Sequence, residues 1–135
     1  MATTNAFNHI AFNCVNLAEQ EAFYTKHFGF KRSRTFNRGE PGEFFLLKLG
    51  SVRLEMFSTD RTKTVAMQGG EQPIGFKHLA FDVPKLEPVI AGLQADGIEV
   101  DKIVVVESIP GLRIAFFRDP EGNIIELMEG FYDEE

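Results

Sequence analysis

The chain has 135 residues, a net charge of −6, and ordinary proportions of hydrophobic (44%) and charged (25%) residues. These values are typical of a globular protein that folds without disulfides, and the single Cys14 cannot form an internal one. The acidic balance and the lack of a basic stripe argue against nucleic acid and anionic membranes as partners. No apolar run approaches the ~20 residues of a membrane span, and residues 1–4 do not open a signal peptide, so we expect a cytoplasmic protein.

The first half of the sequence predicts the element order β-α-β-β-β. Period-two alternation at the N-terminus places His9 and Asn13 on the same face of a strand. Asn16 and Glu19 form a capping box that begins a helix, and Gly29 is a natural left-handed stop for it. The predicted strands of this half cover residues 7–15, 30–37, 43–49 and 52–57.

The second half repeats this order after a polar connection, residues 58–75. Pro88 lies in the first turn of the second predicted helix, near 85–96, where its missing N–H is no loss. Its strands are predicted at residues 76–83, 98–106, 112–118 and 123–128. We therefore expect one domain over residues 1–135, made of a module 7–57, the connection, and a module 76–128.

A histidine and a glutamate recur at matched positions of the two modules. His9 and His78 are 69 residues apart, and Glu55 and Glu126 are 71 apart. All four lie in apolar, strand-like runs, where an unpaired charge is costly. Two imidazoles and two carboxylates in equivalent places of a duplicated unit can converge on one divalent cation. Mixed ligation of this kind suits Zn²⁺, Ni²⁺, Co²⁺, Mn²⁺ or Fe²⁺.

Four segments of the sequence carry a resemblance to a known family. They are His9-Ile10-Ala11-Phe12, residues 23–30 (FYTKHFGF), residues 75–81 (GFKHLAF) and residues 117–126 (FRDPEGNIIE). With them the chain resembles the vicinal oxygen chelate superfamily over residues 7–128. That superfamily includes glyoxalase I, methylmalonyl-CoA epimerase, extradiol dioxygenases and bleomycin-resistance proteins. The resemblance implies an α+β fold, in which two βαβββ modules pair into one curved, open-barrel-like sheet.

The resemblance also implies a metal site and a reaction. Glyoxalase I-like enzymes place His or Gln, then Glu, His and Glu, at positions that match His9, Glu55, His78 and Glu126. The function implied is a metal-dependent lyase or isomerase that acts on a small vicinal-oxygen substrate through an enediolate. By the same resemblance Glu126 is the expected base, and Glu55 is the second candidate.

Other members of the superfamily define the alternatives. Extradiol dioxygenases use three of the four positions, and the epimerases typically carry Gln where Glu55 stands. Bleomycin-type proteins, which bind small molecules without turnover, usually lack the ligands. Bacterial glyoxalase I tends to hold glutathione with Arg and Asn at positions that are Asn13 and Thr59 here, so the substrate and any use of a thiol stay open. A homodimer is the family expectation.

Three arginines are further candidates for binding. They could hold an acidic group of the substrate, although isolated arginines are more often plain surface charge. They are Arg38, Arg53 and Arg113.

Overall fold

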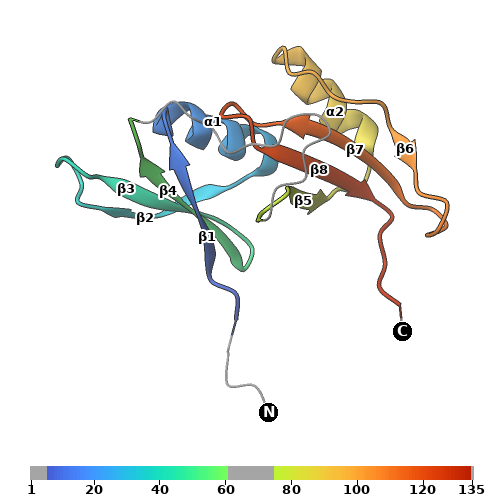
Figure 1. Ribbon diagram of the computed structural model, residues 1–135, viewed down its shortest axis with the longest axis horizontal. Helices are drawn as coiled ribbons and strands as arrows, with labels where there is room; N and C mark the ends of the chain where they lie inside the picture. The colour runs from blue at the N-terminus through green and yellow to red at the C-terminus, as the bar shows by residue number, and fades with distance from the viewer. Residues whose placement is uncertain (1–5, 61–74, 135) are drawn as a thin grey trace. The chain divides into compact units, whose positions relative to one another are not determined.

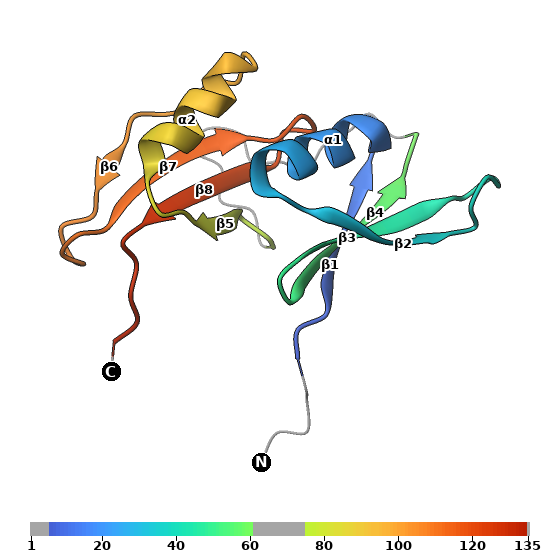
Figure 2. The ribbon, with the colours of Figure 1, turned by 180° about the vertical axis from the view of Figure 1, so that it is seen from behind.

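The computed structural model describes residues 6–60 and 75–134. The chain divides into two compact units, Met1–Lys63 and Thr64–Glu135, and each is described by itself (Figures 1 and 2). Residues 61–74 of the predicted connection lie outside the described residues. No helix in the described parts of the chain is long and apolar enough to cross a membrane.

The first unit has the predicted order β-α-β-β-β. Its sheet has the strand order β1-β4-β3-β2, with β1 parallel to β4 and the other neighbours antiparallel. The two-residue turn Gly50-Ser51 joins β3 to β4, with Gly50 in the left-handed region (φ 59°). The elements are β1 (His9–Cys14), α1 (Leu17–Phe28), β2 (Lys31–Phe36), β3 (Phe44–Leu49) and β4 (Val52–Ser58).

The second unit repeats this topology. Its strand order is β5-β8-β7-β6, again with the first and last strands of the unit parallel and adjacent. The sequence therefore predicted the order of elements in both units correctly. The elements are β5 (Leu79–Asp82), α2 (Leu86–Ala95), β6 (Val104–Val105), β7 (Arg113–Arg118) and β8 (Ile124–Glu129).

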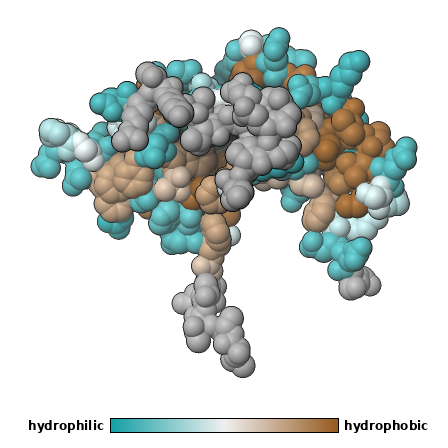
Figure 3. Space-filling model, viewed as in Figure 1, coloured by the Kyte–Doolittle hydropathy of each residue, from teal (hydrophilic) through white to brown (hydrophobic). Residues whose placement is uncertain are grey.

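The strand predicted at 98–106 is too long, because only β6 and an isolated bridge between Val100 and Phe117 form there. The pairing with β7 shifts by one residue between that bridge and the pair Val104–Ile114, so the ladder is interrupted. The first unit has a comparable one-residue shift within β2. β6 is short and exposes Val104 and Val105. Figure 3 shows a brown, hydrophobic region of the surface where Figure 1 draws β6.

Helix α1 has the ends that the sequence predicted. The backbone N–H of Glu19 donates to Oδ1 of Asn16 (3.0 Å), and the Asn16 amide donates back to the Glu19 carboxylate (3.3 Å). Gly29 takes the left-handed conformation (φ 78°), and its N–H donates to the carbonyl of Thr25 (3.1 Å).

Aromatic packing joins α1 to its sheet. Tyr24 is fully buried and meets the rings of Phe12 and Phe30 edge-on, with centroids 6.2 and 5.7 Å away. Phe45 is buried on this helix-covered face. Phe44 takes the opposite face, where it stacks on Phe36 and Phe57. The covered face is the core, and the opposite face is open within the unit.

Helix α2 begins differently, because Lys85 at its N-cap makes no side-chain capping bond. Glu129 at the end of β8 replaces the cap, and its Oε1 accepts from the backbone N–H of Leu86 (3.0 Å). Arg113 on β7 binds Glu129 (2.7 and 3.0 Å) and also the first-turn Glu87 (2.8 and 2.9 Å), both through two hydrogen bonds. One arginine thus ties the start of α2 to two strands.

This cluster predicts how acid affects stability. The Arg113 guanidinium lowers the pKa of Glu87 to about 2 and also lowers the pKa of Glu129. These two carboxylates bind protons more weakly in the folded state than in the unfolded one. The stabilisation that the cluster provides is therefore full above the ordinary glutamate pKa of about 4.3. It is lost as the pH falls toward 2. Salt screens the contribution of the exposed Glu87.

We expect Arg113→Leu to lower stability at pH 6 and to flatten its decline between pH 6 and pH 3. The urea midpoint at each pH measures this, with Lys102→Leu as the control at an exposed position of the same unit. An unchanged pH dependence in Arg113→Leu would show that the cluster does not couple protons to folding.

Candidate metal site

In the first unit the structure brings the predicted residues His9 and Glu55 together. Glu55 lies directly opposite Ala11 in the parallel β1–β4 pair, and His9 is two residues before Ala11 on the same face. Because the small side chain of Ala11 leaves space beside Glu55, the His9 imidazole can reach diagonally from β1 to the carboxylate on β4. Nε2 of His9 is 3.2 Å from Oε1 of Glu55, and their side chains are 38% and 16% exposed.

The second unit builds the same pair in the same register. Glu126 lies opposite Ala80 in the parallel β5–β8 pair, and His78 is two residues before Ala80. Nε2 of His78 is 3.0 Å from Oε1 of Glu126, with the side chains 25% and 13% exposed. His78, predicted inside a strand, lies just before β5. Its ring and that of Phe116 on β7 pack in a T-shaped arrangement, with centroids 5.5 Å apart.

Asn8 sets the orientation of the first histidine, a role that no pattern in the sequence predicted. Nδ1 of His9 is 2.8 Å from Oδ1 of Asn8, so Nδ1–H donates to that oxygen. In the neutral ring this leaves the Nε2 lone pair directed at the Glu55 carboxylate. Two acceptors 3.2 Å apart require a proton or a cation between them.

The two pairs suit metal binding in donor type and spacing. Histidine Nε2 and glutamate Oε1 are ordinary ligands of first-row divalent ions. Two ligand atoms that each lie ~2.1 Å from one ion, with a right angle between the two bonds, are roughly 3.0 Å apart. The distance between the histidine nitrogen and the glutamate oxygen in each pair is close to this value. Within the described residues of either unit, no third His, Cys, Asp or Glu joins a pair. Each unit thus offers two ligands, and a four-ligand site stays a prediction.

Three further residues with reactive or charged side chains are held in contacts that support the fold. Cys14 is fully buried with Sγ 3.5 Å from the sulfur of Met56, as expected of a core thiol. Asp119 is buried in the β7–β8 turn, where its carboxylate accepts from the backbone N–H groups of Glu121 and Asn123. Arg113, a candidate for binding an acidic substrate group, is instead bound to the two glutamates near α2.

The fold and the paired residues define a class of protein. Two βαβββ modules each carry one His–Glu pair, placed identically on the open face of the sheet. The chain belongs to the glyoxalase/bleomycin resistance protein/dioxygenase superfamily, whose family model matches residues 6–127.

Relatives match over nearly the whole chain. The uncharacterized protein YwkD of Bacillus subtilis is 33% identical over 126 residues, covering 92% of this chain and 96% of YwkD. The structure of a glyoxalase family protein from Enterococcus faecalis is 36% identical, with TM-score 0.74 and 92% and 97% of the chains covered. Lactoylglutathione lyase from Agrobacterium tumefaciens shares the fold at 22% identity, with TM-score 0.66 and 96% of each chain covered.

The Asn8 contact yields a prediction about metal affinity. Asn8→Ala removes the acceptor that orients His9, and loss of such an outer partner typically weakens metal binding 10–100-fold. We expect about tenfold weaker Zn²⁺ binding, measured by competition with a chromogenic chelator. Asn13→Ala is the matched control, because Asn13 lies on the same face of β1 beyond Ala11. Equal affinities of wild type and Asn8→Ala would contradict this role.

Proposed function

We propose that the protein is a metal-dependent lyase or isomerase of glyoxalase I type, acting on a small vicinal-oxygen substrate through an enediolate. The observation that carries the proposal is the repeated diagonal His–Glu pair, at the same register in both units. His9, Glu55, His78 and Glu126 would together hold one divalent ion, of Zn, Ni, Co, Mn or Fe. When bound, this ion supplies Lewis acidity for the neighbouring oxygens of the substrate.

The residues of the chain would handle the proton. Glu126 is our choice for the base that removes a proton from the carbon next to the carbonyl and returns it to the adjacent carbon. Glu126 is mostly buried and lies among apolar neighbours on β8, so little bulk water competes for that proton. Glu55 holds the equivalent place in the first unit and is the second candidate. The product is an isomer of the substrate, with no net oxidation.

Glu55 separates this function from its alternatives within the superfamily. A dioxygenase with three ligands does not need a carboxylate at this position, whereas a lyase with four ligands does. A protein that only sequesters a small molecule needs no ligand set, yet both pairs are complete here. The proposed site therefore favours turnover over sequestration.

We further propose a cytoplasmic homodimer. The exposed valines of the short strand β6 support an association of chains, because strand edges and exposed apolar side chains favour pairing. Nickel and zinc are the first metals to test.

Metal content tests the site. We expect about one first-row metal ion per chain in the purified protein by elemental analysis, and its loss in His78→Ala and in Glu126→Gln. His27→Ala is the control, because that imidazole packs against Phe23 on α1 and takes no part in the proposed site. Wild-type protein that binds no metal after addition of Ni²⁺ or Zn²⁺ would contradict the lyase function and favour the small-molecule binder.

Turnover tests the reaction. We expect Glu126→Gln to lower kcat 10²–10⁴-fold on a substrate converted by the wild type, a range typical of losing a general base. The assay follows isomerisation in D₂O by NMR, with methylglyoxal and a series of thiols as the first substrates. Glu55→Gln should also lose most activity. Unchanged activity in Glu55→Gln would instead point to three-ligand chemistry.

A further inference from the structure

Basic side chains form a row across the open face of the first sheet. His9 on β1 pairs with Arg53 on β4, Arg53 pairs with Lys48 on β3, and Lys48 pairs with Lys31 on β2. Paired residues of neighbouring strands point to the same face of a sheet. The row therefore runs over all four strands and begins at the histidine of the candidate metal site.

The charges in this row are unfavourable for the stability of the sheet. Like charges directly opposite each other in an antiparallel pair are destabilising. No hydrogen bond or ion pair joins the side chain of Lys48 or Arg53 to any residue among 6–60 and 75–134. The chain carries 20 acidic and 14 basic residues, so it is not short of carboxylates that could have stood opposite. An unfavourable arrangement of this kind, with no compensating contact among the described residues, is expected at functional sites.

The second unit provides an internal comparison. Ile124 is two residues before Glu126, as Arg53 is two residues before Glu55, and its partner on β7 is Arg118. That arginine faces an aliphatic side chain and donates to the carbonyl of Gly122 (2.7 Å). The direct opposition of two cations beside a His–Glu pair is thus a property of the first unit alone.

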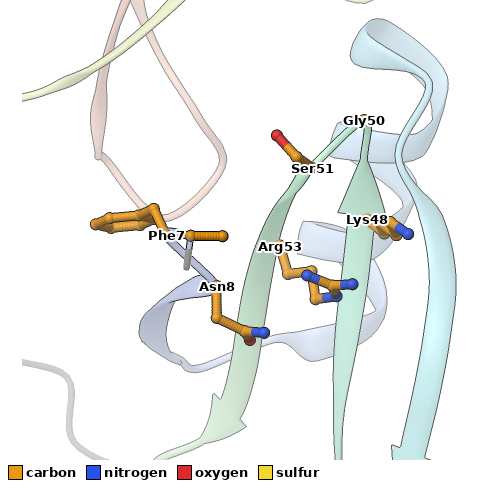
Figure 4. Close-up of a pocket in the computed structure, with 7 residues that line it drawn as sticks. Phe7, Asn8, Lys48, Gly50, Ser51 and Arg53 are labelled. Carbon is orange, nitrogen blue, oxygen red and sulfur yellow. The ribbon is translucent and has the colours of Figure 1, made fainter. Parts of the chain in front are cut away.

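The two cations line a cavity of about 530 Å³ (Figure 4). Arg53 and Lys48 contribute from neighbouring strands, and Ser51 and Gly50 contribute from the turn between those strands. Asn8, which orients His9, lies at the same cavity. Its lining residues are Ala6, Phe7, Asn8, Lys48, Gly50, Ser51 and Arg53, all in the first unit.

We propose that this cavity binds an oxyanion group, a carboxylate or a phosphate, carried by the substrate. The inference rests on the proposed function and narrows its substrate class to anionic molecules. Arginine offers a planar fork of donors that matches both oxyanions, and lysine adds a second charge. Because Arg53 is the direct neighbour of His9 on the sheet, an anion held there lies beside the first His–Glu pair.

The test uses the full-length protein without metal, so that anion binding is measured independently of catalysis. The probes are inorganic phosphate and acetate, added at constant ionic strength against chloride, with amide shifts followed by ¹H–¹⁵N NMR. We expect saturable shifts at Gly50, Ser51 and Arg53, with at least one of the probes showing a dissociation constant in the millimolar range. The probe that binds more tightly identifies the oxyanion.

Arg53→Ile is the decisive variant, because it installs the residue that the second unit carries. We expect at least tenfold weaker binding of the preferred probe in Arg53→Ile and in Lys48→Ala. Lys102→Ala, at an exposed position of the other unit, should bind as the wild type does. Dispersed spectra of each variant establish that it is folded.

Two outcomes would overturn the inference: shifts no larger with phosphate or acetate than with chloride, or saturable shifts unaffected by Arg53→Ile. Zn²⁺ affinity measured on the same samples separates this failure from that of the proposed function. A wild type that binds metal but neither anion would disprove the oxyanion site alone. A wild type that binds an anion but no metal would disprove the lyase proposal and leave this site intact.

Discussion

The diagonal contact between a histidine and a glutamate across two parallel strands is the constraint on which the candidate site depends. It requires that the first and last strands of each unit be neighbours, which the β1-β4 and β5-β8 pairings provide. It also requires a small residue opposite the carboxylate, and Ala11 and Ala80 occupy that place. The helix-covered face of each sheet carries the core. The open face is therefore free to hold polar groups that a core would not tolerate.

The two units anchor their helices in different ways. Unit one uses a capping box at Asn16 and a left-handed Gly29, both local in sequence. Unit two has no side-chain cap at Lys85 and relies on Glu129, which is distant in sequence and held by Arg113. One topology is thus stabilised by local bonds in one copy and by a tertiary ion cluster in the other.

Much of this architecture could be predicted from the sequence, and the failures have physical reasons. Period-two alternation placed His9 and Asn13 on one face of their strand, and Gly29 marked a helix end, because these signals are local. The prediction for 98–106 failed because a one-residue register shift depends on the partner strand. The role of Asn8 was missed because it depends on the orientation of one imidazole ring. The convergence of the four residues on one ion stays a prediction.

The opposition of Lys48 and Arg53 was within reach of the sequence. A two-residue turn at Gly50-Ser51 fixes which residues of the flanking strands face each other, and counting outward from it pairs these two. The sequence could not predict that these two residues align with His9. Parallel strands are joined by a long connection, so no turn fixes their register, and packing sets it instead.

The difference between Arg53 and Ile124 has a consequence for how such a protein can change over time. In a duplicated fold, each copy can keep its paired histidine and glutamate while the residue two positions before the glutamate varies independently. A substitution there alters which molecules are attracted, yet it leaves the neighbouring histidine, glutamate and alanine in their register. New ligand preferences can therefore arise by single replacements on one half of the molecule, without disturbing the His–Glu pairs and without loss of the fold.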